Sequence, residues 1–527
     1  MSLETTAASP RPGLPFLISL AAAVLLQLWC YHAELPARAG VGYHHVASVR
    51  ELAKGEFPPA NNLVPGRTPV GHYGPYLVLL GLVARVTGAP PLLVLEAAGL
   101  ALLVLYLLLF HALLVRLVSP AAANWSVPAA LLLWGPWPGA DMPWLAWGWP
   151  GTTSAADPQN FFYPQHAALT LLVWLLLSAR GPETRARGLG LVTIAALLIA
   201  THPYTGFALV TALGAWLVAL LWRRQLRARA AALLVLVPVL GLLVAAAWPY
   251  YPVWRLLGTF ADPNFRQPLP PAVVHDPSPA PPPPTLEATA GSEAQPGAPP
   301  GGVDWAATVV PAWHILGPAL LGLAGAAAIA RRGDVFLLAW SLLALGLALC
   351  PWVPLRERLV TFAAIPLQLG AAAVFEGLWR RRIAGRAVVA ALLLASGFVA
   401  WKRLEFVHDL PLLDLGFVAA VTPEDAVIMA PDGLANVVAG QTGRKVANPE
   451  GPDLFLILAG GARRMLDQRR FYAWGTRAGE REAILRRWRV THVLIDRFVP
   501  FPGTPPGALR AERDGLALYD VRAPAAP

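Results

Sequence analysis

The sequence predicts an α-helical, polytopic membrane protein of about 11 to 12 transmembrane helices, followed by a small C-terminal extracytoplasmic α/β domain. Hydrophobic residues make up 56% of the 527-residue chain and charged residues only 14%, whereas a soluble globular domain is roughly a quarter charged. The mean hydropathy is +0.52. The apolar residues are gathered in long runs, and after Trp401 the pattern changes to short alternating helices and strands.

Eleven apolar runs are long enough, or nearly long enough, to cross a bilayer. They are residues 14–31, 73–87, 92–118, 163–177, 189–200, 206–222, 231–250, 309–330, 335–351, 359–378 and 387–401. The first run lacks an A-x-A cleavage site, so we expect a retained helix and not a signal peptide. A further run, 126–134, is less than half a span. It is either re-entrant or a sign that a neighbouring run is misassigned.

Basic residues lie in short clusters between the apolar runs, at 222–229, 330–334 and 379–386. Under the positive-inside rule these clusters mark the cytoplasmic side, so the net charge of +10 does not indicate nucleic acid as a partner. We expect a multi-pass protein of the cell (inner) membrane whose C-terminal domain lies outside the cytoplasm.

This topology divides the chain into a polytopic membrane domain, 1–401, and an extracytoplasmic α/β domain, 402–527. The membrane domain has three long outer loops, at 32–72, 139–162 and 251–306. Within the last loop, 267–302 is rich in proline, alanine and glycine and is expected to be a disordered flap. The residues suited to chemistry fall mainly in the outer loops, so function is expected on that side.

In the C-terminal domain, "DAVIMAPDGLANVVAGQTGRKVAN" predicts a strand, a short helix and a second strand. "ARRMLDQRRFYAW" and "GEREAILRRWRV" are typical of amphipathic helices, and "THVLIDRFV" and "LALYDVR" of strands. The "APDG" turn lacks the spaced glycines of a nucleotide fingerprint, so we predict no nucleotide site there.

The first outer loop contains a predicted helix at residues 44–54, which Gly55 ends. One face of this helix carries His45, Val49 and Leu52, and the other carries His44, Ser48 and Glu51. The pattern favours an amphipathic helix on the outer membrane surface. A solvated connector with interfacial anchors is the alternative.

The first loop and the helices after it resemble the GT-C superfamily of polyprenyl-phosphate-dependent membrane glycosyltransferases, which includes protein mannosyltransferases and aminoarabinose transferases. The resemblance rests on a juxtamembrane helix ending in L-x-x-G-x-x-P, on "GHYGPY" before the second membrane helix, and on many helices before an external α/β domain. "GHYGPY" keeps the family's glycine, tyrosine and proline but not their order. The resemblance implies transfer of a sugar from a polyprenyl-phosphate donor to an extracytoplasmic acceptor, which is a cell-envelope glycan, lipid or protein.

The family's first catalytic acid, an aspartate just before the juxtamembrane helix, is missing. The matching stretch, "AGVGYHH", has glycine and valine at that place. Glu34 lies earlier in the same loop and is one candidate, although a carboxylate there also suits the water interface. His44 and His45 are candidates for the base, because imidazole titrates near neutral pH. Adjacent residues on opposite faces of a helix would direct one of the two rings into the site.

The family's second acidic position resembles Asp157 in "SAADPQNFFYPQHAALTLLV". Its carboxylate could help to bind Mg²⁺ or Mn²⁺, or could instead cap the turn before Pro158. His166 lies one turn into the following helix and could face the same site.

Five further residues are candidates for binding substrate. His72 and Tyr73 belong to "GHYGPY", and His202 ends a membrane helix at "THPYTG", where the family often has a histidine; a cap on backbone carbonyls is the alternative for His202. Arg356 and Arg358 stand at the outer end of a late membrane helix, against the positive-inside trend, and planar guanidinium groups suit a carrier phosphate. The family also has an arginine before this helix.

Two other functions remain open. A catalytically degenerate lipid-sugar binding protein on the same scaffold would explain the missing aspartate. A transporter is the second, but the apolar runs hold few ionisable residues, among them Glu96 and His111, whereas ion-coupled carriers bury such residues near the midplane.

Overall fold

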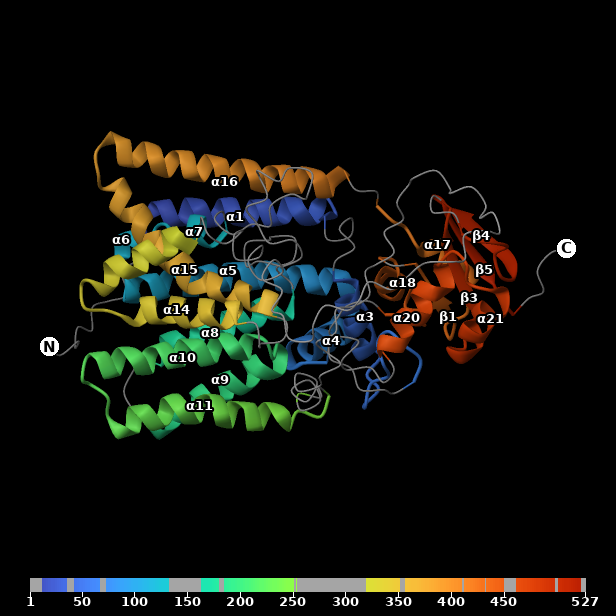
Figure 1. Ribbon diagram of the computed structural model, residues 1–527, viewed down its shortest axis with the longest axis horizontal. Helices are drawn as coiled ribbons and strands as arrows, with labels where there is room; N and C mark the ends of the chain where they lie inside the picture. Colours follow the sequence, from blue (N-terminus) through green and yellow to red (C-terminus); the bar gives the residue numbers. More distant parts are fainter. Residues whose placement is uncertain are drawn as a thin grey trace, which may run out of the picture.

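The computed structural model describes residues 12–35, 42–66, 73–131, 163–179, 184–250, 253, 319–350, 356–409, 412–431, 433–449, 461–497 and 501–522. Long helices form a bundle, and a small sheet with its own helices lies at one end of it (Figure 1). The predicted flap at 267–302 and the loop 139–162 lie outside the described residues.

Each of the eleven predicted apolar runs overlaps a helix. These helices are α1 (Leu14–His32), α4 (Pro75–Thr87), α5 (Pro91–Leu117), α8 (Pro164–Ser178), α9 (Arg185–Thr201), α10 (Thr205–Trp222), α11 (Ala228–Ala246), Ala319–Ala330, α14 (Phe336–Leu349), α15 (Arg356–Trp379) and α16 (Ile383–Asp409). Proline occupies the first turn of α1, α4, α5 and α8, where its fixed φ suits a helix and its missing N–H leaves no bond unmade.

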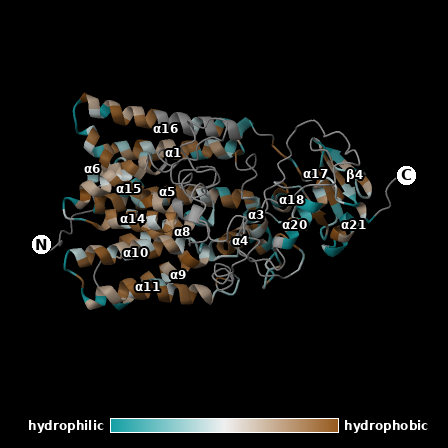
Figure 2. Cartoon of the chain, in the orientation of Figure 1, coloured by the Kyte–Doolittle hydropathy of each residue, from teal (hydrophilic) through white to brown (hydrophobic). Residues whose placement is uncertain are grey.

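Several of these helices are suited to a membrane. Within the described residues, α1, α5, α10, α11 and the Phe362–Trp379 part of α15 are long and apolar enough to cross a bilayer. The other apolar helices are shorter, so the number of spans stays a prediction. Large apolar side chains such as Leu79, Leu105 and Val244 point outward from the bundle, and most residues of the bundle helices are coloured as hydrophobic in Figure 2. Such a surface is stable in lipid and not in water.

The short run after α5 forms two small helices, α6 (Pro120–Ala123) and α7 (Ser126–Leu131). With six residues, α7 is too short to cross the membrane. It is held against α15, where the buried Gln368 amide donates to the Ala130 carbonyl at 3.1 Å.

The sheet has five strands in the order β2-β1-β3-β5-β4. The strands are β1 (Val427–Met429), β2 (Lys445–Val446), β3 (His492–Asp496), β4 (Ala508–Arg513) and β5 (Leu516–Asp520), and the accompanying helices are α17 (Gly416–Val421), α18 (Ala435–Thr442), α20 (Gly461–Tyr472) and α21 (Ala478–Arg487). β1 is parallel to β2 and β3, whereas β3, β5 and β4 are antiparallel. The sequence patterns indicated all of these strands except β4, an edge strand whose side chains are mostly exposed and polar.

The two faces of the sheet are buried in different ways. One face, with Met429 and Val493, packs against Phe471 of α20 and Ile484 of α21. The opposite face contributes Ile428, Leu494 and Leu518 to a hydrophobic core that also contains residues of the first loop and of α4. The sheet therefore shares a core with the N-terminal part of the chain.

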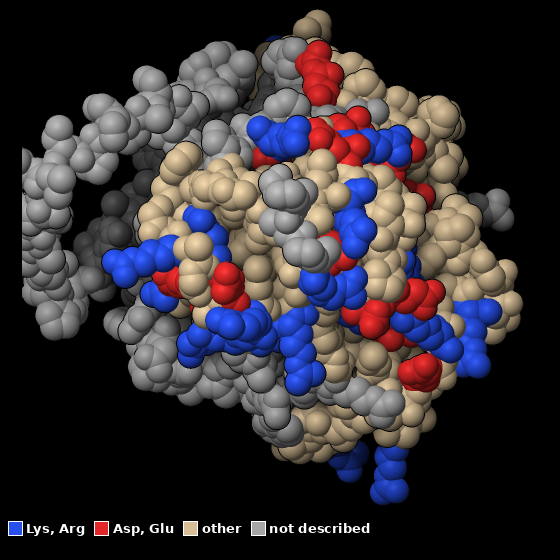
Figure 3. Space-filling model, turned by 90° about the vertical axis from the view of Figure 1, so that its right-hand side faces the viewer, with Lys and Arg blue, Asp and Glu red and all other residues tan. Residues whose placement is uncertain are grey.

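The surface at the sheet end is ionic. In Figure 3, basic and acidic side chains alternate over this face without a large region of one sign. Arg497 pairs with Glu512 at 2.8 Å, and Arg513 pairs with Asp414 at 2.9 Å. Charged pairs of this kind are typical of a surface in water.

The turns that carry the arginine clusters lie at the other end of the bundle, away from the sheet (Figure 1). Two of them are in contact, because Arg223 donates to the Gly333 carbonyl at 3.3 Å and pairs with Asp334 at 3.0 Å. The separation of these turns from the sheet agrees with the predicted topology, in which they face opposite sides of the membrane.

This arrangement predicts opposite labelling of the two ends. In a background with Cys350 replaced by serine, Gly479→Cys on exposed α21 should react with an impermeant thiol reagent in intact cells. Arg332→Cys, exposed at the arginine end, should react only after the membrane is opened. Equal labelling of both cysteines in intact cells would contradict the topology.

Candidate functional site

The helix of the first loop, α3 (Tyr43–Ala53), lies between α4 and the helix α18. Eight of its eleven residues are buried, including the polar Ser48 and Glu51. The helix itself was predicted, and its position on the membrane surface stays a prediction. Its polar face does not meet water, because the C-terminal part of the chain covers it.

Arg50 and Tyr43 join α3 to the end of α18. The Arg50 guanidinium donates to the carbonyls of Ala439, at 3.1 Å, and Gln441, at 3.3 Å. These carbonyls belong to the last turn of α18, and the Ala439 carbonyl also accepts from the Gly443 amide at 3.1 Å. The Gln441 amide donates to the Tyr43 hydroxyl at 2.8 Å. Gly440 permits this approach, since a Cβ there would lie 2.5 Å from the Tyr43 Cβ.

A charged pair forms the second contact between the loop and the sheet. The Lys445 ammonium lies 3.0 Å from the Glu51 carboxylate and also donates to the Asn61 carbonyl at 2.5 Å. Lys54 contacts the same carboxylate at 3.0 Å. Burial opposes ionisation of Glu51, but the two ammonium groups outweigh it and hold the pKa of this carboxyl below its usual value. The Val446 amide donates to the Leu63 carbonyl at 2.7 Å, so the loop also bonds to β2.

Two predicted site histidines meet an aromatic ring at the start of α3. The rings of His44 and His45 lie 3.9 Å apart, and the Tyr163 ring lies 5.0 Å from His45 and 6.3 Å from His44. The helical period predicts that the two imidazoles point to opposite faces of the helix. They instead lie side by side. Neighbouring Cβ atoms are only 100° apart on a helix, so χ1 rotation brings both rings beside Tyr163.

Tyr163 links this pair to His166. It is the N-cap residue of α8, and its carbonyl accepts from the His166 amide at 2.9 Å. His166 is buried, with 1% of its surface exposed. The structure thus brings the rings of His44 and His45 to Tyr163, three residues before His166, from a segment more than a hundred residues away in the chain.

An asparagine that the sequence analysis missed holds the backbone of this cluster. The buried Asn62 amide donates to the His44 carbonyl at 3.1 Å and to the Ser48 hydroxyl at 2.8 Å. Ser48 in turn donates to the His44 carbonyl at 2.8 Å. The pair "NN" in a proline-rich loop is the available signal, since asparagine often bonds to nearby backbone. Its tertiary partners could not be read from that signal.

Tyr73 and His202 lie in a neighbouring group of helix ends. The Tyr73 hydroxyl donates to the Ala60 carbonyl at 2.5 Å, and its own carbonyl accepts from the Trp248 indole at 2.8 Å. Gly74 follows, and a Cβ there would lie 2.7 Å from the Ala200 carbonyl oxygen, so α4 begins directly against the end of α9. Tyr73 is buried and so tied to the scaffold.

His202 is the C-cap residue of α9, and its Nδ1 lies 2.9 Å from the Thr205 hydroxyl. Its ring is 6.3 Å from that of Phe362 in α15. The backbone positions of Arg356 and Arg358 form the first turn of the same helix, one to two turns before Phe362. The turn between α9 and α10 is therefore close to the end of α15 that carries the two arginines.

The other predicted residues are placed only in part. Glu34 is exposed just after α1, with the left-handed φ of 56°. Burial, together with the nearby Glu34 carboxylate, raises the pKa of the Tyr43 phenol, so this acid lies near the start of α3. Asp157 and His72 lie outside the described residues. In the described ranges no three His, Cys, Asp or Glu side chains group as a metal site requires, so these residues alone do not fit Mg²⁺ or Mn²⁺.

Comparisons with known proteins assign no family to the chain. No protein-family model and no curated protein matches its sequence. Two similar solved structures are those of the Archaeoglobus fulgidus oligosaccharyltransferase, in the apo form and tethered to an acceptor peptide containing the NVT sequon. They are 12% and 14% identical, with TM-scores of 0.46 and 0.48, and each comparison covers 91% of this chain and 69% of the other. Values this low establish neither the family nor the activity.

The lowered pKa of Glu51 predicts that acid weakens the contact between the first loop and the sheet. The separated state takes up the proton near pH 4.3, the ordinary value for glutamate, whereas the docked state takes it up at lower pH. The stabilisation is therefore complete above about pH 5 and is lost as the pH falls through 4 and below. The thermal unfolding midpoint of the wild type should fall more steeply below about pH 4.5 than that of Glu51→Gln. Parallel curves would contradict this role for Glu51.

Proposed function

We propose that the chain is a membrane glycosyltransferase that moves a sugar from a polyprenyl-phosphate donor to an acceptor at the sheet end of the bundle. The observation that carries the proposal is the meeting of His44 and His45 with Tyr163 at the start of α8. Imidazole is the common general base near neutral pH. The site stands where apolar helices end and a water-facing α/β unit begins, as a lipid-linked donor and a soluble acceptor require.

In the proposed reaction, the acceptor hydroxyl oxygen attacks the anomeric carbon while its proton passes to His44 or His45. The bond between the anomeric carbon and the phosphate oxygen breaks, and its electron pair leaves with the carrier phosphate. The configuration at the anomeric carbon inverts. Positive charge at the start of α15, from Arg356 and Arg358, would stabilise the leaving phosphate, so no general acid is required.

The remaining candidate residues would position the substrates. His166 and His202 stand beside the proposed base and beside α15, respectively, and His72 and Tyr73 precede α4. We assign them to substrate binding. Glu34 and Asp157 are the alternative bases, and Asp157 would also be the ligand of any Mg²⁺ or Mn²⁺. No step above depends on a metal.

A catalytically degenerate lipid-sugar binding protein is the second candidate. The sequence "AGVGYHH" favours it, because no acid stands directly before α3. Such a protein would retain the donor in the same place without transferring its sugar. Turnover and donor binding, measured on the same preparation, separate the two functions.

Replacing the proposed base should abolish transfer but not binding. His45→Asn keeps the size of the side chain and removes its titrating group, so turnover of a polyprenyl-phosphate sugar should fall roughly 10²-fold or more, with donor affinity unchanged. The matched variants are His44→Asn, Glu34→Gln and Asp157→Asn. If donor is consumed at the wild-type rate in all four, the catalytic proposal is wrong; if the wild type consumes none with any acceptor, the degenerate alternative gains.

Replacing the proposed phosphate ligands should weaken donor binding. Arg356→Leu or Arg358→Leu removes a charge-assisted hydrogen bond worth about 1.5 to 3 kcal/mol, so the affinity for the carrier phosphate should fall roughly tenfold or more. Arg380→Ala, at the arginine end of the bundle, is the control and should leave binding unchanged. Equal losses in the variants and the control would indicate a general effect on stability and not recognition.

A further inference from the structure

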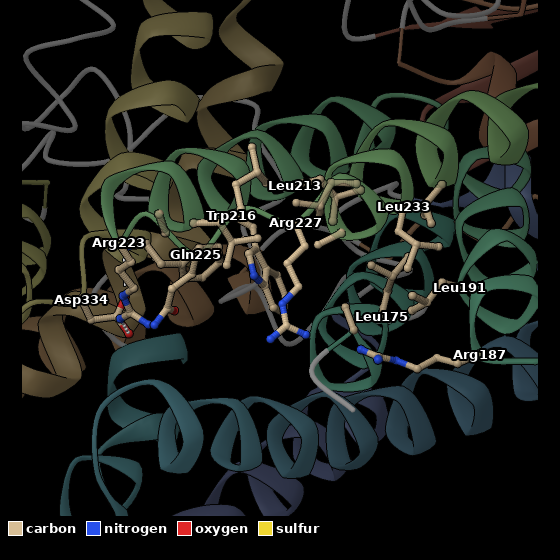
Figure 4. A pocket seen from close by; sticks show the side chains of 18 of the residues that line it. Leu175, Arg187, Leu191, Leu213, Trp216, Arg223, Gln225, Arg227, Leu233 and Asp334 are labelled. Carbon is tan, nitrogen blue, oxygen red and sulfur yellow. Dashed lines mark hydrogen bonds and ion pairs between the residues drawn. The ribbon is translucent and has the colours of Figure 1, made fainter. Parts of the chain in front are cut away.

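A cavity of about 970 Å³, shown from close by in Figure 4, lies at the arginine end of the bundle, opposite the end near α3 in Figure 1. Its walls come from α8, α9, α10, α11 and the start of α14. None of the residues assigned to the proposed function lines it. The cavity therefore needs an explanation of its own.

Positive charge gathers at the mouth of this cavity. Five arginines line it, and the acidic residue among the lining residues is Asp334; the arginines are Arg116, Arg187, Arg223, Arg224 and Arg227. The positive-inside rule explains why arginines lie on one side of the membrane, but not why they surround one cavity. Here they come from three parts of the chain, α5, α9 and the turn between α10 and α11, and surround one space, as they would around an anion.

The arginines differ in what already binds them. Arg223 is paired with Asp334 at 3.0 Å. Arg116 donates to the Leu177 carbonyl at 2.9 Å, and Arg187 donates to the Ser178 carbonyl at 2.7 Å. Both arginines therefore supply hydrogen-bond donors to the last carbonyls of α8.

The side chains of Arg224 and Arg227, in contrast, form no hydrogen bond or ion pair with any other described residue. In Figure 4 the Arg227 guanidinium extends into the cavity toward the side from which Arg187 enters it. Two guanidinium groups are thus available to an anion without breaking a contact with another described residue.

The inner wall of the cavity is apolar. Leu175, Leu191, Leu213, Leu233 and Val237 line it together with Trp216. Leu213 and Arg223 are ten residues apart along or just beyond α10, so the apolar wall reaches roughly 15 Å from the charged mouth. A water-soluble anion would gain nothing from contact with an apolar wall of this length, whereas an acyl chain would bury apolar surface against it.

The backbone at Arg224 supports a role for its side chain. The amides of Arg224 and Gln225 donate to the carbonyls of Leu221 and Leu220, both at 2.9 Å, in the pattern that ends a helix with a left-handed residue. Arg224 has φ 52°, a position at which glycine is favoured. The arginine has a conformational cost at this position, and it lines the cavity.

We propose that this cavity binds an anionic phospholipid, with the headgroup phosphate against Arg224 and Arg227 and an acyl chain along the apolar wall. The lipid would seal the space between α8, α9, α10 and α11 at the membrane surface. This site is independent of the proposed transferase function and would exist in a binding protein as well.

The purified full-length chain in detergent can be titrated with dioleoylphosphatidylglycerol, and the bound lipid counted by native mass spectrometry. Arg227→Gln and Arg224→Gly should each weaken binding roughly tenfold. Arg224→Gly should do so without lowering the thermal unfolding midpoint, because glycine suits the left-handed φ. Arg229→Gln is the matched control: it makes the same change of charge on α11, but Arg229 is exposed and does not line the cavity.

Three outcomes would overturn the proposal. The first is an equal loss of binding in Arg229→Gln, which would indicate general surface charge. The second is equal binding of dioleoylphosphatidylcholine, or displacement of the lipid by millimolar inorganic phosphate, since the ligand would then be any lipid or a soluble anion. The third is a lowered unfolding midpoint in Arg224→Gly together with its loss of affinity, which would mean a structural role for the arginine.

Discussion

The burial of α3 is the constraint on which the rest of the structure depends. A helix with Arg50 and Glu51 on its surface can leave water only if each charge finds a partner. The end of α18 supplies carbonyls to Arg50, and β2 supplies Lys445 to Glu51. In return, α3 and its loop cover the face of the sheet that α20 and α21 leave open. Without this exchange, both the helix and the sheet would expose apolar surface.

The same burial fixes the position of the histidines. His44 and His45 stand in the first turn of α3, so their place relative to Tyr163 follows from how α3 sits between α4 and α18. Asn62 adds a local restraint on the His44 carbonyl. The geometry of the candidate site is therefore set by contacts on the side of α3 that carries Arg50 and Glu51, and not by the histidines themselves.

The sequence predicts the helices of the bundle well, because their signals are local. Apolar length and proline in the first turn indicate a helix without knowledge of its neighbours. The α3 helix was also predicted from its period, but the environment of its polar face was not. Polar residues facing water and polar residues facing a paired charge look the same in one sequence, and the partner of Arg50 lies 389 residues away. The chain has only three lysines, and two of them pair with Glu51. This pairing cannot be read from the sequence, because the fold brings Lys445 to Glu51.

The long separation between Glu51 and Lys445 has a consequence for how the protein is made. At about 5 to 20 residues per second, a ribosome needs roughly 20 to 80 s to reach Lys445 after it has added Glu51. During that time α4 and α5 can insert, but Lys445 and the α18 carbonyls, which contact Glu51 and Arg50, do not yet exist. Until the sheet is made, apolar residues of the first loop such as Val49 and Leu52 lack the sheet residues that share their core. A chain that ends before β2 would therefore carry every membrane helix and still lack an assembled site.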